Sequence, residues 1–461
     1  MQRGMPVPVW GEADPGAPVT VTFGGQARHT RADAKGAWRV TLAPMPAGSE
    51  PRVLSVASGG ARAEAQNVLV GDVWLCAGQS NMQVWVEGSD VSRSLKTADD
   101  PLLRVFLVDV TSTNMPAARF RQGPPPEMVN VQRDRMNQYG LKWTPATQES
   151  ARWFSAVTYA FGRQIHRQTG VPTGLITAAL GGTPAQAWTS RDALLASPTL
   201  RPLADQPRSS GLYNGSIAPL APFAVKGVVW YQGESDADNY EEAIRYRALL
   251  PAMIGSWRKA WGYPVPFVLV QLPAFHPVQA QPSDSPWAWL REAQAMTAQS
   301  APQVELAITI DTGLADNLHP GAKTAVGERA ARAALALVYH QPVVPAGPSF
   351  QSMVIRGGAV RVRWTNVGTG LRSLKVTTNG GATQIAANPV QGFSVCGANQ
   401  QFVWAEARIA GKDTVVVSSP QVPQPVAVRY AWAGFPLCNL YNSDGLPASP
   451  FRTDHFAPAR P

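Results

Sequence analysis

Apolar and polar residues follow three successive patterns along the chain, with changes near residues 70 and 341. In residues 1–70, apolar side chains alternate with polar ones in short runs, which are separated by turn signals such as Asp14-Pro-Gly16. Helical spacing is absent from this part. Because alternation with period two places every second side chain on one face of a strand, residues 1–70 are predicted to form a small β-sandwich.

The pattern changes in residues 71–341, where short apolar runs alternate with longer segments of helical spacing. The runs lie near residues 72–77, 173–179, 225–231, 266–272 and 304–310. In the segments near 240–261 and 322–338, apolar residues recur every three or four positions. Strands that alternate with helices are typical of a parallel sheet with helices packed against it. We therefore predict an α/β core in this part.

Period two returns after a proline-spaced linker that begins at Pro342. Residues 342–461 are predicted to form a third, β-rich domain, in which Thr378-Asn-Gly-Gly381 indicates a hairpin. Within the core, the segment 109–150 is polar and proline-rich, with Gly123-Pro-Pro-Pro126 and little periodicity. A loop of this length is either part of a functional cleft or a surface segment.

The amino-acid composition indicates a folded protein and excludes some classes of partner. The chain has 461 residues, of which 45% are apolar and 15% charged, as in folded proteins of several domains. No run reaches the roughly 18 apolar residues of a membrane span, so no membrane partner is expected. The net charge of +9 comes from scattered residues and does not predict a nucleic-acid surface.

The ends of the chain and its cysteines leave two questions open. The first ten residues contain no apolar signal-peptide core and read like the interior of a β-domain. We therefore suspect that a strand and any leader lie upstream of this sequence. Three cysteines do not form a disulfide framework. Cys396 and Cys438 could pair, and their spacing does not decide it.

Candidate chemistry follows four of the predicted strands. Gly78-Gln-Ser80-Asn follows the first, Gly181-Gly-Thr183 the second, and Gln232-Gly-Glu-Ser235 the third. Asp316-Asn-Leu-His319 lies in the loop after the last. Because ligands bind at the carboxyl ends of parallel strands, these segments are expected to meet at one edge of the sheet.

The residue types suit a nucleophilic serine. A serine hydroxyl needs a base within hydrogen-bonding reach and a group that orients that base. His319 is the candidate base, and Asp316, three residues earlier, is the candidate orienting acid. Either motif alone would be ordinary, as a turn serine or a surface loop. Their combination with the other two segments predicts a serine hydrolase.

Attack on an ester carbonyl generates an oxyanion, which fixed hydrogen-bond donors stabilise. The candidate donors are the backbone N–H groups of Ser80 and Gly182 and the side-chain amide of Gln232. Glycines at 181 and 182 allow close approach of the backbone to a substrate. His276 follows the fourth predicted strand, and a structural role is favoured for it. No metal-binding, phosphate-binding or dinucleotide motif is present, so neither a metal nor a cofactor is expected.

Together the four motifs resemble the sialate O-acetylesterase-like branch of the SGNH hydrolases. The resemblance includes residues 6–16 and 428–447 and thus covers nearly the whole chain. It implies an SGNH-type (flavodoxin-like) three-layer α/β/α hydrolase core with a parallel sheet, flanked by an N-terminal β-sandwich and a C-terminal β-rich domain. The predicted domains are residues 1–70, 71–341 and 342–461.

The same resemblance implies a carboxylic ester hydrolase, with Ser80 as nucleophile, His319 as base and Asp316 as its partner. Glu234 is expected to support the histidine or the site, and which carboxylate orients His319 is left open. SGNH enzymes generally have an Asn where this chain has Gln232, so the third oxyanion donor is also open. The residues expected to bind substrate are Gln79, Asn81, Gly181 and Thr183.

The predicted partner is an O-acetylated carbohydrate. A sialic acid is the first expectation, and an acetylated hemicellulose such as xylan or xyloglucan is the alternative. A non-catalytic carbohydrate-binding protein is a second alternative, which the complete serine, histidine and aspartate set disfavours. A lipase or thioesterase is disfavoured because no long apolar lid is evident. The resemblance implies a periplasmic or secreted protein, and the sequence does not predict an oligomeric state.

Overall fold

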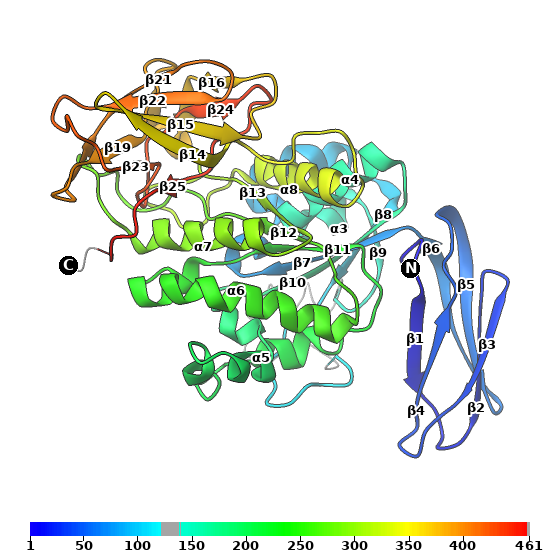
Figure 1. The fold of residues 1–461 in the computed structure, drawn as a ribbon. Helices are drawn as coiled ribbons and strands as arrows, with labels where there is room; N and C mark the ends of the chain where they lie inside the picture. Colours follow the sequence, from blue (N-terminus) through cyan, green and yellow to red (C-terminus); the bar gives the residue numbers. More distant parts are fainter. Residues whose placement is uncertain (121–137, 139, 459–461) are drawn as a thin grey trace.

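The fold is described from a computed structural model, which describes residues 1–120, 138 and 140–458 (Figure 1). The proline-rich stretch at 123–126, predicted as cleft wall or surface loop, lies outside the described residues. None of the described helices is long and apolar enough to cross a lipid bilayer.

A seven-stranded sheet forms the centre of the molecule, in the order β13-β12-β11-β7-β10-β8-β9. In chain order its strands are β7 (Asp72–Gly78), β8 (Asp100–Leu107), β9 (Thr144–Ala146), β10 (Thr173–Ala179), β11 (Gly227–Tyr231), β12 (Phe267–Val270) and β13 (Val304–Ala307). All pairs are parallel except β8 with β9. The five predicted strands are confirmed, and β7 lies in the middle of the sheet.

Strand β8 and the edge strand β9 next to it were not predicted. Both are poor sequence signals, since β8 begins with Asp100-Pro101 and contains Arg104, whereas β9 has three residues, one of them Pro145. Proline is common in edge strands because it cannot donate to a sheet hydrogen bond.

Helices cover both faces of the sheet (Figure 1). On one face lie α4 (Ala156–Thr169) and α8 (Lys323–Leu337), and on the other lie α6 (Tyr240–Trp261) and α7 (Pro286–Ser300). The helices predicted near 240–261 and 322–338 are confirmed, and the arrangement is the expected three-layer α/β/α core. Shorter helices are α1 (Ser80–Gln83), α3 (Gln148–Arg152) and α5 (Arg191–Ala196).

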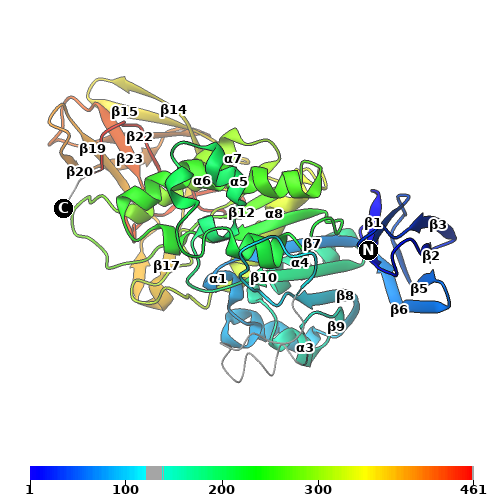
Figure 2. The same ribbon diagram turned by 90° about the horizontal axis from the view of Figure 1, so that it is seen from below.

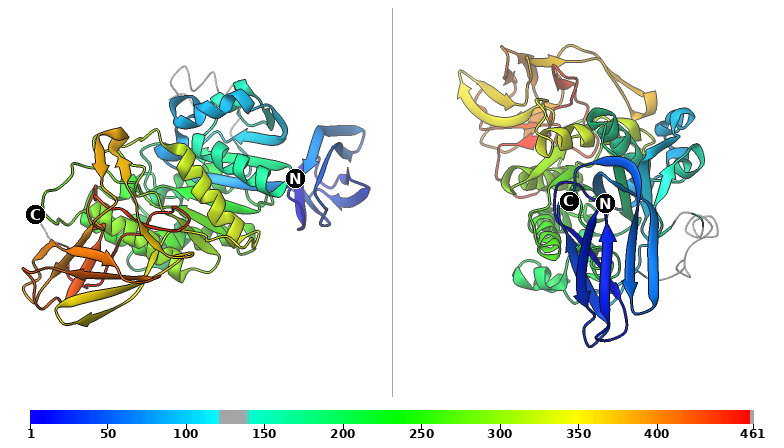
Figure 3. Two further views of the ribbon diagram at one scale, coloured as in Figure 1. Left: turned by 90° about the horizontal axis from the view of Figure 1, so that it is seen from above. Right: turned by 90° about the vertical axis from the view of Figure 1, so that its right-hand side faces the viewer.

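The first seventy residues form six strands, which lie at one end of the molecule (Figure 3). They are β1 (Val7–Glu12), β2 (Pro18–Phe23), β3 (Gln26–Arg31), β4 (Ala37–Leu42), β5 (Gly48–Ser58) and β6 (Ala61–Val70). Strands β3-β2-β5-β6 form one sheet, and β1 pairs with β4. The alternation seen in the sequence is real, since Val19, Val21 and Phe23 are buried between more exposed neighbours.

The last part of the chain is also β-rich, and it lies at the opposite end from β1–β6 (Figure 3). Its sheets are β14-β15-β22-β21, β20-β19-β23-β25, β16-β24 and β17-β18. Their strands are β14 (Ser349–Arg356), β15 (Ala359–Thr365), β16 (Leu371–Ser373), β17 (Val376–Thr378), β18 (Thr383–Ile385), β19 (Phe393–Cys396), β20 (Phe402–Trp404), β21 (Glu406–Ile409), β22 (Thr414–Ser418), β23 (Ala427–Tyr430), β24 (Leu440–Asn442) and β25 (Phe451–Arg452). The predicted hairpin is confirmed as β17–β18. Cys396 and Cys438 are separate, buried thiols and do not pair.

Candidate active site

Ser80 lies in a sharp turn between β7 and α1, at the end of β7 away from strands β1–β6 (Figure 2). Gly78 has φ +150°, and a Cβ there would lie 2.0 Å from the carbonyl oxygen of Tyr231. The N–H of Gln79 donates to that same oxygen at 3.1 Å, and the N–H of Leu180 donates to the Gly78 carbonyl at 3.1 Å. Strands β10 and β11 therefore clamp the turn, which leaves the Ser80 side chain half-buried at the edge of the sheet.

The buried side chain of Asn81 joins three of the four motifs. Its Nδ2 donates to Glu234 Oε1 at 2.5 Å and to the Leu318 carbonyl at 2.9 Å. Asn81 follows Ser80, and Leu318 precedes His319. The predicted meeting of these segments at one sheet edge is therefore confirmed, although they are far apart in the sequence.

The double glycine lies directly beside Ser80. A Cβ placed on Gly181 would be 3.2 Å from the Ser80 Cβ, and the N–H of Gly181 donates to Gln83 Oε1 at 3.0 Å. Gly182 is exposed and has φ +68°. Within the described part of the chain, the N–H groups of Ser80 and Gly182 donate to no acceptor. Two backbone donors thus remain available next to the serine.

Gln232, predicted as a third oxyanion donor, has its amide inside the protein. Its Nε2 lies 2.6 Å from Asp236 Oδ2, 3.1 Å from Gln79 Oε1 and 3.2 Å from the Thr183 carbonyl. Its Oε1 accepts from the Tyr246 hydroxyl at 2.8 Å. Because these partners occupy both ends of a fully buried amide, the structure favours a supporting role for Gln232.

Of the four residues predicted to bind substrate, three are likewise buried: Gln79, Asn81 and Thr183. Gln79 Oε1 accepts from the N–H groups of Gly233 and Ser235, at 3.3 and 3.2 Å. The Thr183 hydroxyl donates to the Leu180 carbonyl at 2.7 Å. These side chains hold the motifs to one another, an arrangement that disfavours direct contact with a ligand.

His319 and Asp316 lie on the exposed loop after β13. Partial burial and the nearby Lys323 ammonium lower the pKa of His319. Among the described residues, no hydrogen bond joins the His319 ring to Ser80 or to Asp316. Such bonds often form only with substrate in place. The roles of base and orienting acid therefore stay predictions, as does the choice between Asp316 and Glu234.

Lys323 is a site residue that the sequence analysis missed. It is fully buried at the start of α8, and its Nζ donates to Asn81 Oδ1 at 2.5 Å. A signal for it was present, because position 323 falls on the apolar face of the predicted helix, together with Val326 and Ala330. A lysine on such a face is unusual unless it is paired.

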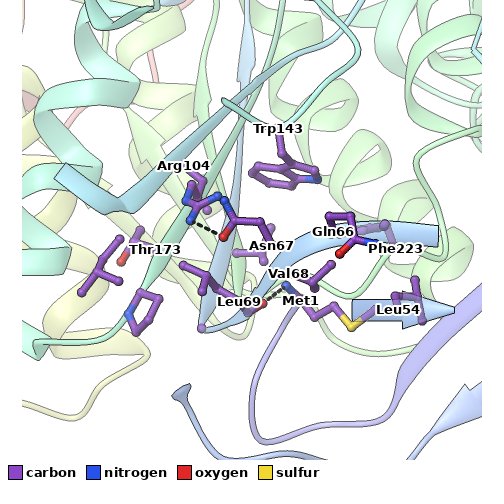
Figure 4. Close-up of a pocket in the computed structure, with 16 residues that line it drawn as sticks. Met1, Leu54, Gln66, Asn67, Val68, Leu69, Arg104, Trp143, Thr173 and Phe223 are labelled. Carbon is purple, nitrogen blue, oxygen red and sulfur yellow. Dashed lines mark hydrogen bonds between the residues drawn. The ribbon is translucent and has the colours of Figure 1, made fainter. Parts of the chain in front are cut away.

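Neither His276 nor the pocket beside β6 adds to this site. His276 is exposed, with its ring against Phe275 and Trp287. A pocket of about 370 Å³ lies between β6 and the amino ends of β7, β8 and β10, where Arg104 donates to Asn67 (Figure 4). It is thus at the opposite end of the strands from Ser80. No group of three or more His, Cys, Asp or Glu in the described ranges could hold a metal ion.

The chain is similar in sequence and in structure to known acetylesterases. Sialate O-acetylesterases from Mus musculus and Homo sapiens are 26% and 28% identical to this chain, over 96% of its length and 90% and 88% of theirs. The structure of a carbohydrate acetylesterase from Xanthomonas citri has a TM-score of 0.85 and 37% identity, covering 99% of this chain and 97% of that one. A family model described as carbohydrate esterase, sialic acid-specific acetylesterase, matches residues 70–336, which include all four motifs. The chain belongs to this family of sialic acid-specific acetylesterases and is a carboxylic ester hydrolase.

Proposed function

We propose that the protein removes O-acetyl groups from sialic acids through a covalent acetyl-Ser80 intermediate. The observation that carries this proposal is the 2.9 Å bond from Asn81 Nδ2 to the Leu318 carbonyl, which ties the Ser80 turn to the His319 loop. A serine and a histidine from opposite ends of the core are thereby held at one sheet edge.

In the proposed reaction, Ser80 Oγ attacks the acetyl carbonyl while His319 takes its proton. The carbonyl oxygen becomes an oxyanion, which the N–H groups of Ser80 and Gly182 stabilise. When the ester C–O bond breaks, the leaving sugar oxygen takes the proton from His319. A water molecule, activated in turn by His319, then hydrolyses the acetyl-serine to acetate and free Ser80.

A second candidate substrate is an acetylated hemicellulose such as xylan or xyloglucan. It is favoured by a pocket of about 550 Å³ beside the segment that follows β12. One wall is Trp404, a residue that is 42% exposed and whose Nε1 donates to the Ala280 carbonyl at 2.8 Å. The lining contains Gln279, Gln281 and Glu406 but no lysine or arginine. An aromatic face with amides and a carboxylate, but without a cation, suits an uncharged glycan better than a carboxylated sugar.

The nucleophile is tested by Ser80→Ala, with Ser300→Ala as the matched control, because Ser300 is exposed at the end of α7. Removal of a nucleophile of this kind costs up to about 10⁶ in turnover. We expect Ser80→Ala to lose acetate release and Ser300→Ala to keep it. Wild-type hydrolysis of p-nitrophenyl acetate by Ser80→Ala would refute the mechanism.

The substrate is tested by acetate release from O-acetylated sialic acid, acetylxylan and acetylated xyloglucan, with Ser80→Ala as the blank. Preferential release from sialic acid supports the first candidate, and preferential release from either polysaccharide supports the second. Asp316→Asn and Glu234→Gln, assayed side by side, show which carboxylate supports His319. Export to the periplasm or the medium stays a prediction.

A further inference from the structure

Lys323 is a charged group in the interior of the protein. It contacts Asn81, the residue that follows the candidate nucleophile Ser80. Its side chain is fully buried, and its Nζ lies 5.5 Å from the ring centre of Tyr231. Removal of an ammonium from water is costly unless the charge is paired and hydrogen-bonded. The partner within hydrogen-bonding distance is Asn81 Oδ1 at 2.5 Å.

This contact determines which way the Asn81 amide points. An ammonium has three donors and no acceptor, so Asn81 must turn its oxygen toward Lys323. The amide nitrogen then faces the opposite way, where it donates to Glu234 Oε1 and to the Leu318 carbonyl. If the amide were reversed, its nitrogen would face the ammonium, and the bond to the His319 loop would be lost.

We propose that Lys323 is a positioning residue for the hydrolysis: its ammonium orients Asn81 and thereby holds Ser80 against the His319 loop. This inference rests on the proposed function. It adds to that function a residue that lies behind the serine and does not touch substrate.

Electrostatics agree with the geometry. Burial, the largest effect, lowers the pKa of Lys323 to about 7. The charged groups Glu234 and Asp90 act in the opposite direction. Asp90 Oδ1 also accepts from the Lys323 backbone N–H at 2.8 Å. The positive charge in turn lowers the pKa of His319, in addition to the effect of burial. Because the pKa of Lys323 is about 7, its charged form predominates at pH values below 7.

The experiment compares Lys323→Met, which removes the charge at similar length, with Lys323→Arg, which keeps it. Lys259→Met is the control, because Lys259 is an exposed lysine on α6. kcat and KM for p-nitrophenyl acetate are measured from pH 4.5 to 8, after circular dichroism has shown that each variant is folded. For Lys323→Met we expect kcat to fall about 10- to 100-fold, with KM little changed.

The acidic limb of kcat/KM distinguishes positioning by charge from a purely structural role. In Lys323→Met it should move to higher pH, toward the ordinary histidine value of about 6.5, whereas Lys323→Arg should keep it near the wild-type position. A folded Lys323→Met with wild-type kcat, or with a reduced kcat and an unmoved acidic limb, would overturn the proposal.

Two further measurements keep the outcome interpretable. If Lys323→Met does not fold, NMR titration of His319 in the wild-type protein replaces it, and a His319 pKa at or above 6.5 would refute the inference. Ser80→Ala is assayed in the same series. Activity retained by Ser80→Ala would overturn the proposed function itself, whereas an inactive Ser80→Ala beside a wild-type-like Lys323→Met would overturn only the role of Lys323.

Discussion

Asp236 lies wholly inside the protein, beneath the double glycine next to Ser80. Its Oδ2 accepts from Gln232 Nε2 at 2.6 Å and from the N–H of Ala185 at 2.9 Å. Burial raises the pKa of Asp236 to about 7, although both hydrogen bonds act in the other direction. The segment that follows the double glycine is therefore anchored to a carboxyl group whose ionisation is unfavourable in the folded state.

This burial predicts a pH-dependent stability that Asp236→Asn should remove. A carboxyl group whose pKa is raised by folding contributes stability that is fully present below its unfolded pKa, about 3.9, and is lost as pH rises toward 7. Asparagine keeps an acceptor oxygen and does not titrate. Between pH 4 and 7.5, the unfolding free energy of the wild type should fall relative to that of Asp236→Asn, by at most about 4 kcal/mol.

Urea denaturation of both proteins across this range measures the difference, since the other titrating groups are common to both. Parallel curves for the two proteins would contradict the raised pKa of Asp236.

At the scale of elements, the side chain of Arg291 on α7 is one connection between the central sheet and the C-terminal part. Arg291 is fully buried and donates to four carbonyl groups. Two belong to the segment after β12 and two to the segment after β23, at distances of 2.6 to 2.9 Å: Leu272, Pro273, Ala433 and Gly434. The loop that leaves β12 at the active-site edge is thus held from the C-terminal side.

Arg291→Met should leave the buried carbonyls of Leu272 and Ala433 without a donor, whereas Pro273 and Gly434 each keep a second donor. Each unsatisfied buried group costs about 1–3 kcal/mol, so the free energy of unfolding is expected to fall by at least about 2 kcal/mol in denaturant titrations. The matched control is Arg245→Met on α6, which removes an ion pair to the exposed Glu241 and should cost about 0.5 kcal/mol. Equal losses in the two variants would show that Arg291 does not connect these elements.

At the scale of the whole molecule, the two β-rich parts are joined to the centre differently. Buried residues of the C-terminal strands, such as Val362 and Trp364, belong to the same hydrophobic core as the central sheet. Strands β1–β6 instead enclose two small cores of their own. The hairpin β17–β18 also contacts the loop that carries Asp316 and His319, since Asn379 Oδ1 accepts from the N–H of Ala315 at 2.8 Å.

A shared core predicts cooperative unfolding of the centre with the C-terminal part. In hydrogen exchange monitored by mass spectrometry at increasing urea, peptides from 349–452 should lose protection together with those from 227–307. Peptides from 7–70 should lose it at lower urea, because smaller cores are less stable. Earlier exchange of the C-terminal peptides than of the central sheet would refute this prediction.

A site residue could be predicted where a local sequence pattern marks it, and not where its role depends on contacts with residues far away in the sequence. Ser80, the double glycine and His319 could be found because each follows a strand with a clear apolar pattern, and parallel topology brings strand ends together. The short edge strand β9 could not, because three residues with a proline carry too little pattern. Gln232 looked available as a donor in the sequence, but three acceptors surround its Nε2 in the structure.

From the sequence alone we could predict five of the strands in the central sheet, two of its long helices, the edge at which the four motifs meet, and a serine as the candidate nucleophile there. These predictions follow from local periodicity and from residue chemistry, and both can be read from the sequence without a structure. Which polar side chains are free to meet a ligand, and which are used in internal hydrogen bonds, could be seen only in the folded structure. Lys323, Asn81 and Gln232 were assigned to the interior by contacts between residues up to 242 positions apart, and such contacts depend on packing, which local sequence does not specify.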